Sequence, residues 1–218
     1  VSFFKTTHSV PESFGIVVKT RKGNIVYTGD FKFDQTAAVG YKTDLGRLAE
    51  IGHEGVLALL SDSANAENPK ETVDEHVIFD FISETFEYHK GRIIVACVAS
   101  NILRVQQIFE AASANDRKVV LTGHDAEKIV KTAMRLNKLH LPSDDLLVPL
   151  KDIKKYNDDE VVILETGRSG EPLKSLQKMA LGRHRAVNIH EGDLVFITTT
   201  PSHAVETTVA KTRDMIYR

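Results

Sequence analysis

Short apolar runs alternate along the chain with segments whose apolar residues recur every three or four positions. The runs have the length of strands and cover residues 55–60, 92–98, 118–122, 161–164 and 194–200. The segments between them have the spacing of one helix face. This alternation predicts an α/β fold with parallel strands and right-handed crossovers. The run at 55–60, Gly-Val-Leu-Ala-Leu-Leu, predicts a strand that is buried on both faces.

Five helices are predicted from apolar spacing and from residues that can cap a helix N-terminus. Asp44 is a capping residue before the first helix, and Thr72 with Glu75 has the form of a capping box before the second. The residues expected to face inward are Leu45, Leu48, Ala49 and Gly52 in the first helix, Ile78, Phe79, Ile82 and Phe86 in the second, Ile102, Val105, Ile108, Phe109 and Ala112 in the third, Ile129, Val130, Ala133, Met134 and Leu136 in the fourth, and Leu173, Leu176, Met179 and Ala180 in the fifth.

The first part of the chain predicts a β-hairpin with polar residues on both flanks. Residues 15–27 read as a strand, an Arg-Lys-Gly-Asn turn and a second strand. His8 precedes the hairpin and Asp30 follows it, so the hairpin brings the two side chains toward each other. Imidazole and carboxylate are ligands that suit zinc or manganese. Taken alone, however, a single His is more often a loop residue, and Gly-Asp after a strand is more often a turn.

Three further strand ends carry polar residues that could form a site. Asp62 follows the run at 55–60, and its carboxylate could act in a site or cap a turn. Ser100 and Asn101 precede a predicted helix, where free backbone amides could bind phosphate. Gly167, Arg168, Ser169 and Gly170 form a second such turn, where backbone could approach a ligand closely. Such turns are usually no more than turns.

Composition sets wide bounds on function. The chain has 218 residues, 42% of them hydrophobic and 27% charged, which is typical of a globular protein with one large or two small cores. No apolar run approaches the roughly 18 residues that a membrane span needs. The single cysteine, Cys97, lies in an apolar run and indicates a buried thiol in a reducing cytoplasm. A net charge of −2 does not exclude RNA, because a local basic patch suffices.

Basic residues gather late in the chain. Lys174 and Lys178 lie one helical turn apart, and Arg183, His184 and Arg185 follow them. Together with Arg168 they are candidates for RNA contact, although charged residues on an exposed helix normally form a solvated face.

Several motifs resemble one family, the ribonuclease J group of metallo-β-lactamase-fold nucleases with a β-CASP domain. The stretch Thr-Thr-His-Ser-Val-Pro-Glu-Ser at 6–13 and the stretch Thr-Gly-Asp-Phe-Lys-Phe-Asp at 28–34 are similar to the family's metal-binding segments. Residues 59–63, Leu-Leu-Ser-Asp-Ser, and the turns at 99–102 and 166–172 also resemble family motifs. The resemblance extends over nearly the whole chain.

The resemblance implies metal-dependent hydrolysis of RNA. His8 and Asp30 would be metal ligands, Asp30 bridging, and Asp62 would be an acidic residue of the catalytic site. The metal would be zinc or manganese, or magnesium. Ser100, Asn101 and the loop from Gly167 to Glu171, including Arg168, Ser169 and Gly170, would hold the terminal phosphate and nucleotide of RNA. We expect a cytoplasmic protein that acts in RNA processing and decay, as an exonuclease, an endonuclease or both, and that does not engage a membrane.

Departures from the family pattern indicate reduced activity. Leu103 stands where the family has His, and Arg168 and Ser169 stand where it has Ser-Gln. An isobutyl group can neither bind phosphate nor carry a proton. The pattern resembles the second, weaker paralogue of Gram-positive bacteria, which assembles with the first. The alternative is an inactive subunit that scaffolds or regulates an active ribonuclease J.

The resemblance also predicts a domain organisation. We expect residues 1–70 to be the later part of the first metallo-β-lactamase segment, with an αββα architecture. Residues 71–218 are expected to form a Rossmann-like, parallel-sheet β-CASP domain that is incomplete at its C-terminus. The chain starts in mid-pattern, without the family's upstream His-x-His-x-Asp-His motif, and is expected to be a fragment. We therefore expect these residues alone to hydrolyse no RNA.

Overall fold

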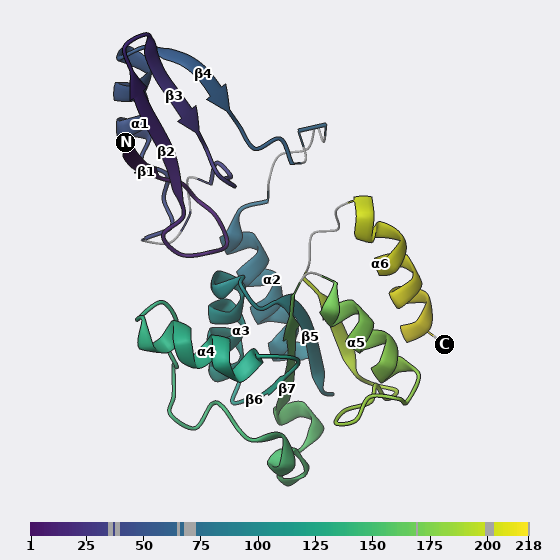
Figure 1. Cartoon of the computed structure of the whole chain (residues 1–218). Helices are drawn as coiled ribbons and strands as arrows, with labels where there is room; N and C mark the ends of the chain where they lie inside the picture. Colours follow the sequence, from purple (N-terminus) through teal and green to yellow (C-terminus); the bar gives the residue numbers. More distant parts are fainter. Residues whose placement is uncertain are drawn as a thin grey trace. The chain divides into compact units, whose positions relative to one another are not determined.

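The computed structural model describes residues 1–34, 37, 40–64, 66–67, 73–168, 170–198 and 203–217. The chain forms two compact units, Val1–Asp80 and Phe81–Arg218. The colours of Figure 1 follow the chain through both. The predicted boundary at residues 68–70 lies outside the described residues. The assignment of the first unit to a metallo-β-lactamase segment stays a prediction.

The first unit is a four-stranded sheet with one helix packed on it. The strands are β1 (Ser2–Lys5), β2 (Phe14–Thr20), β3 (Gly23–Tyr27) and β4 (Val56–Leu60), in the order β1-β2-β3-β4. The pairs β1/β2 and β2/β3 are antiparallel, which confirms the predicted hairpin, and β3/β4 is parallel. Strands β1, β3 and β4 therefore run in the same direction and end at one edge of the sheet.

Helix α1 (Leu45–His53) covers one face of this sheet. Asp44 caps it as predicted, because its Oδ1 accepts a hydrogen bond from the Arg47 amide at 2.9 Å. Ile51 of the helix packs against Phe4, Val17 and Val26, and all four side chains are buried. The first unit thus has a small core on this side. The inward positions expected for Leu45, Ala49 and Gly52 were wrong, because these residues are exposed and the helix is buried at Ile51 instead.

The other face of the sheet is apolar and exposed. Strand residues that alternate with the core residues point to this side, and Phe3, Phe14, Val18, Tyr27 and Leu60 are between 39% and 59% exposed. Leu60 lies beside Tyr27 in the parallel pair, so the patch crosses from β3 to β4. We call these five residues the open sheet face.

The prediction that residues 55–60 form a strand buried on both faces was wrong about burial. The strand is present, but every residue of β4 is exposed. Among the described residues, β4 is the edge strand of its sheet and pairs with β3 alone, and α1 packs over Phe4, Val17 and Val26 instead. An unbroken apolar run shows that a strand tends to be buried, but it does not supply the layers that bury it.

The second unit is an α/β unit around a parallel sheet. Helix α2 (Glu75–Tyr88) contains the division between the units, and ten further elements follow it among the described residues. They are β5 (Ile93–Val98), α3 (Ile102–Ala114), β6 (Lys118–Thr122), α4 (Ala126–Arg135), the 3-10 helices η1 (Leu150–Lys155) and η2 (Asp158–Glu160), β7 (Val161–Gly167), α5 (Glu171–Ala180), β8 (Leu194–Ile197) and α6 (His203–Ile216).

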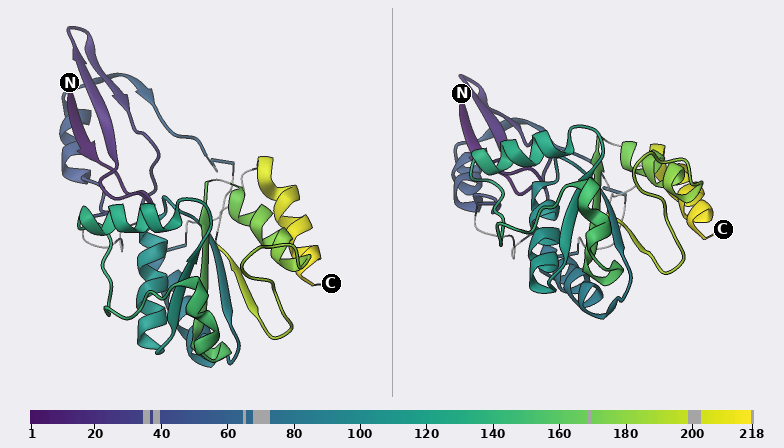
Figure 2. Two further views of the ribbon diagram at one scale, coloured as in Figure 1. Left: turned by 60° about the horizontal axis from the view of Figure 1, so that its bottom comes forward. Right: turned by 90° about the horizontal axis from the view of Figure 1, so that it is seen from below.

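All four strands of this sheet are parallel, in the order β6-β7-β5-β8, as the alternating pattern predicted. From β5 the chain crosses through α3 to β6 on one side, and from β7 it crosses through α5 to β8 on the other. Right-handed crossovers in opposite directions place α3 and α5 on opposite faces of the sheet, as Figure 1 shows and the turned views of Figure 2 repeat. The adjacent strands β5 and β7 therefore form the topological switch point, where α/β proteins bind ligands.

Apolar side chains fill both faces of this sheet. On the α5 side, Ile94, Ala96 and Ile163 pack with Leu176 and Met179 of the helix. All five residues of α3 that were predicted to face inward are buried. In α4, Val130 and Ala133 are buried, but the inward position expected for Leu136 was wrong, since it is 58% exposed just past the last helical residue.

Some sequence features have a different outcome in the structure. The proposed capping box needs Thr72, which lies outside the described residues, and Glu75 pairs with Lys32. Helix α6 was not predicted from the pattern; it packs beside α5, where Gln177 donates to the buried hydroxyl of Thr212 at 2.9 Å. Among the described residues, no helix is both long and apolar enough to cross a bilayer.

Candidate functional site

The structure brings His8 and Asp30 together at the edge of the first unit's sheet. The imidazole Nε2 lies 3.7 Å from Asp30 Oδ2. His8 follows β1, Asp30 follows β3, and the two strands end at this same edge. The side chain of Asp30 is 73% exposed and that of His8 is 33% exposed, so both remain accessible. The hairpin thus produces the convergence that the sequence predicted.

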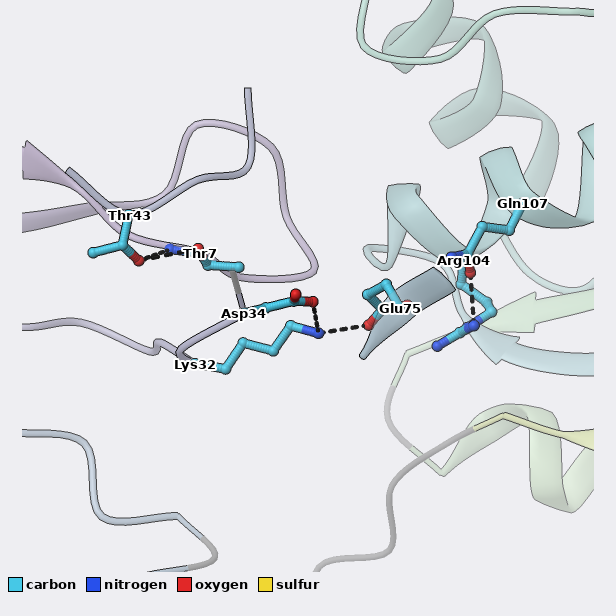
Figure 3. Close-up of polar contacts among 7 residues, drawn as sticks. All are labelled: Thr7, Lys32, Asp34, Thr43, Glu75, Arg104 and Gln107. Carbon is cyan, nitrogen blue, oxygen red and sulfur yellow. Dashed lines mark hydrogen bonds and ion pairs between the residues drawn. The ribbon is translucent and has the colours of Figure 1, made fainter. Parts of the chain in front are cut away.

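A short backbone bridge next to this pair fixes the two loops. Thr7 and Lys32 form an isolated antiparallel bridge in which the Lys32 amide donates to the Thr7 carbonyl at 2.9 Å. Thr7 is buried, and both its amide and its hydroxyl lie 3.0 Å from the Thr43 hydroxyl (Figure 3). Because Thr7 precedes His8 directly and Lys32 is two residues after Asp30, this bridge sets the spacing of the candidate ligands.

Lys32 also joins two carboxylates. Its Nζ lies 3.2 Å from Asp34 and 2.8 Å from Glu75, the first residue of α2 (Figure 3). The side chain of Asp34 is only 1% exposed. A buried carboxylate is costly unless it is paired, so Lys32 neutralises Asp34 and holds the segment after Asp30 in place. The motif Thr-Gly-Asp-Phe-Lys-Phe-Asp therefore contains both a candidate ligand and its support.

Asp62 lies just past β4, at the same end of the sheet as His8 and Asp30. Its amide donates to the Thr28 hydroxyl at 3.0 Å, which links it to the residues just before Asp30. Its Oδ1 accepts from the Ala64 amide at 2.9 Å, as expected of a turn-capping aspartate. The structure thus places Asp62 beside the Asp30 loop with one carboxylate oxygen already in a turn.

The donor set suits part of a metal site. A neutral imidazole and a carboxylate at this separation fit zinc or manganese by donor chemistry. A zinc site takes about four ligands, and no group of three or more His, Cys, Asp or Glu side chains suited to a metal occurs in the part of the chain that the structure describes. His8 and Asp30 fit a metal only as members of a larger ligand set.

In the second unit, the two predicted phosphate turns meet at the switch point. The amide of Ala99, just past β5, donates to the carbonyl of Gly167 at the end of β7 at 3.0 Å. This bond extends the parallel ladder one step beyond the strands and joins the turn that holds Ser100 and Asn101 to the turn that starts at Gly167. The topology therefore brings together two segments that are more than 60 residues apart.

The first of these turns is held by its own cap. Asn101 caps α3, because its Oδ1 accepts from the Arg104 amide at 3.1 Å. Ser100 is exposed, and its carbonyl accepts from the Ile102 amide at 2.9 Å. Leu103 lies half-buried on the first turn of α3. Two polar residues and one apolar residue therefore surround this helix start.

The second turn closes on itself. The Glu171 carboxylate accepts from the Arg168 amide at 2.8 Å, and the Glu171 amide donates back to the Arg168 carbonyl at 2.9 Å. A Cβ on Gly167 would lie 2.9 Å from that carboxylate, so a larger residue there would have to displace the Glu171 side chain. Gly170 has a φ of +81° and starts α5. Arg168 is exposed, and Ser169 lies outside the described residues.

Buried polar residues behind these turns were missed from the sequence. Arg104 donates to Gln107 at 2.6 Å (Figure 3), and the Thr122 hydroxyl donates to Glu165 at 2.6 Å. Arg104 and Glu165 are at most 6% exposed, and both charges act on the thiol of Cys97. Burial is the largest cause that raises the pKa of Cys97 to about 12. The sequence did contain one sign of this buried polar cluster, because Glu165 is a charged residue inside an otherwise apolar strand.

The basic residues predicted for RNA contact lie on the surface, except for one histidine. Lys174 and Lys178 are both exposed on α5 and share a face, as their spacing predicted. The Nδ1 of His184 accepts from the Val187 amide at 3.1 Å, so this ring organises the loop before β8.

Comparisons with known proteins identify a family. A family described as "Ribonuclease J, beta-CASP domain" matches residues 90–216. Over all 218 residues the chain is 59% identical to "Ribonuclease J 2" of Streptococcus pyogenes serotype M3 and 45% identical to "Ribonuclease J2" of Bacillus subtilis strain 168. In both cases it spans 39% of the length of the relative.

One solved structure is similar to this chain in fold alone. "Crystal Structure of a Protein of Unknown Function from Enterococcus faecalis V583" superimposes with a TM-score of 0.57 at 12% identity, over 98% of this chain and 55% of that one. The family match covers more than half of the chain and contains both turns of the switch point. The chain therefore belongs to the ribonuclease J family, and residues 90–216 correspond to its β-CASP domain.

Proposed function

We propose that the complete protein is a metal-dependent ribonuclease of reduced activity that takes part in RNA processing and decay in the cytoplasm. The observation that carries this proposal is the convergence of His8 and Asp30, 3.7 Å apart, in a member of the ribonuclease J family. Membership supports ribonuclease chemistry, and the paired side chains supply donors that such chemistry uses.

The first unit would contribute part of the metal site. His8 and Asp30 would bind zinc, manganese or magnesium, with Asp62 as an acidic neighbour from β4. A divalent metal bound there would lower the pKa of a water and offset charge on the phosphate. The residues themselves do the positioning. The Thr7–Lys32 bridge holds the two loops, and the Lys32–Asp34 pair holds the segment that follows Asp30.

The second unit would hold the end of the RNA. Ser100 and Asn101 at the start of α3 and the tight turn from Gly167 to Glu171 lie at the switch point. There, backbone amides and the exposed guanidinium of Arg168 can bind phosphate. Leu103 on the same helix start offers no hydrogen bond, which is the reason for proposing reduced activity.

The proposal is tested on the complete protein with Asp30→Asn. Metal content after dialysis should fall relative to wild type, and cleavage of 5′-monophosphorylated RNA in Mn²⁺ or Zn²⁺ should fall by roughly 100-fold or more, since the residue is a proposed ligand. Asp144→Asn changes an exposed carboxylate outside the site and is the matched control. Equal metal content in Asp30→Asn and in wild type would show that Asp30 is not a ligand.

A second candidate function is an inactive subunit that scaffolds or regulates an active ribonuclease J paralogue. Leu103 favours it, because it places an apolar side chain at the proposed phosphate turn. Complete wild-type protein that cleaves no RNA in any of the three metals, yet raises the activity of a paralogue with which it co-purifies, would establish this function. Metal-dependent cleavage that Asp30→Asn abolishes would rule it out.

A further inference from the structure

Helix α4 starts from the same edge of the sheet as the two turns of the switch point. It follows β6, which is parallel to β7 and ends beside it, with Thr122 opposite Glu165. Between β6 and α4, Gly123 has a φ of +100°, and a Cβ there would lie 1.8 Å from the carbonyl oxygen of Thr166. The start of α4 is thus fixed directly against the end of β7, next to the turn at Gly167.

The outer side of α4 carries a line of positive charge. Lys128, Lys131 and Arg135 are exposed and are spaced by three and four residues, so they follow one another along successive turns. With a rise of about 1.5 Å per residue, the line is roughly 10 Å long. These side chains, with Glu127 and Thr132, border a surface depression. The opposite side of the helix packs inward through Val130 and Ala133.

The charge balance of this face favours a polyanion. Within α4, three cationic side chains stand against one carboxylate, Glu127, although the whole chain has a net charge of −2. Glu127 pairs with Lys131 at 2.9 Å, but both side chains are at least 70% exposed. An exposed pair of this kind contributes less than about 1 kcal/mol, so a phosphate can replace the carboxylate at little cost.

We propose that Lys128, Lys131 and Arg135 bind successive phosphates of a single-stranded RNA substrate. The inference rests on the proposed function, because RNA is chosen over an acidic protein on the ground that the line starts beside the turns proposed to hold its terminal nucleotide. Contacts of this kind carry no base specificity. Their strength depends on salt: the logarithm of the binding constant falls with the logarithm of the salt concentration, with a slope of about −0.7 for each phosphate contacted on a single strand.

The experiment measures RNA binding by the complete protein with fluorescein-labelled, 5′-hydroxyl, single-stranded RNA. Anisotropy is recorded in chelator, to prevent cleavage, at several salt concentrations. The variant Lys128→Gln/Lys131→Gln/Arg135→Gln should bind roughly tenfold more weakly at 100 mM salt, with a salt slope smaller by about 2. Lys131→Arg should keep the wild-type slope. All three residues lie on the surface, and thermal unfolding checks that the variant folds.

A matched control removes the same charge elsewhere. Lys151, Lys154 and Lys155 are exposed on η1, which leads toward the amino end of β7, and their triple Gln variant should bind RNA within twofold of wild type. An equal loss in both triple variants, or an unchanged slope in the α4 variant, would overturn the proposal. So would normal RNA binding with lost assembly onto a paralogue, which would assign the face to a protein. Wild-type protein that binds no RNA at all would instead refute the proposed function.

Discussion

The guanidinium of Arg117 caps the end of α2 through the carbonyl of Phe86, to which its Nε donates at 3.1 Å. Its other nitrogens donate to the carbonyls of Gly91, at 3.0 Å, and His89. Arg117 is only 2% exposed, and burial lowers its pKa. One buried cation thus satisfies a carbonyl in the last turn of α2 and two carbonyls just past it, and it connects the α2–β5 segment to the start of β6.

Replacing Arg117 should therefore destabilise the second unit strongly. Arg117→Met leaves three buried or partly buried carbonyls without their donor, and the free energy of unfolding should fall by about 2–4 kcal/mol. Arg117→Lys keeps the charge but not the fork of donors, and the loss should be intermediate. Urea unfolding measures both. Arg21→Met, on an exposed turn, is the control, and an equal effect at the two sites would contradict the capping role.

Two glycines should respond in opposite directions to a methyl group. Gly123→Ala puts a Cβ onto the carbonyl oxygen of Thr166 in a backbone conformation that alanine disfavours, so stability should fall by about 3 kcal/mol or more. Gly52 lies in α1 with open space around it, and Gly52→Ala should stabilise by roughly 0.5 kcal/mol. Thermal unfolding measures the change in stability of the two variants. If Gly123→Ala were stabilising like Gly52→Ala, the β6–α4 turn would be able to relax around the added methyl group.

Cys97 should make stability fall at alkaline pH. Its folded pKa is about 12, while an unfolded thiol titrates near 8.5, so only the unfolded chain loses the proton between these values. Stability is complete below about pH 8.5 and declines above it, by roughly 1 kcal/mol at pH 9.5. Burial also raises the pKa of Tyr41 to about 12, so the comparison stops at pH 9.5, below the pKa of about 10 at which an unfolded tyrosine loses its proton. The midpoints of urea unfolding at pH 7.5 and 9.5 measure this loss of stability. The loss should be smaller in Cys97→Val than in wild type.

Leu103→His should change the choice of RNA end in the complete protein. Leu103 is half-buried on the first turn of α3, beside Ser100 and Asn101, where an imidazole could donate to a phosphate. A charge-assisted hydrogen bond contributes about 1.5–3 kcal/mol, which is roughly a 10- to 100-fold gain for 5′-monophosphorylated over 5′-hydroxyl RNA. Competition binding at fixed salt measures the ratio. A folded variant with an unchanged ratio would place the phosphate elsewhere.

The open sheet face should make the 218-residue chain self-associate. Val18 and Leu60 belong to an exposed apolar patch, and β4 is an unprotected edge strand. Val18→Lys/Leu60→Lys should lower the apparent mass in light scattering at high concentration and reduce binding of an apolar dye. Leu136→Lys removes an exposed leucine outside this face and should change neither signal. A monomeric wild-type chain at every concentration would refute the expectation.

Local patterns were enough to predict most of the second unit. The strands β5, β6 and β7 are apolar runs, and α3 buries the residues whose spacing predicted it. The parallel arrangement followed from the alternation of strands and helices. The pairing of His8 with Asp30 also followed, because a tight hairpin has few ways to fold.

Features that depend on distant residues could not be read from the sequence. The exposure of β4 is set by the layers around it, and these do not appear in its own apolar residues. The contact between Thr122 and Glu165 joins residues from two strands that only the sheet order brings together. Helix α6 gives a weak pattern, because it packs on α5 through contacts such as Gln177–Thr212 as well as through apolar side chains.

The position of β5 between β7 and β8 has a consequence for how the protein is made. Ile93 pairs with Val162 on one side and Leu194 on the other, so β5 leaves the ribosome long before either neighbour exists. At the usual rate of synthesis, about 5–20 residues per second, the roughly 100 residues to its last partner take about 5–20 s. During that time the sequence Ile-Ile-Val-Ala-Cys-Val is exposed and prone to aggregate. Binding by a chaperone to the nascent chain would be most useful in this interval.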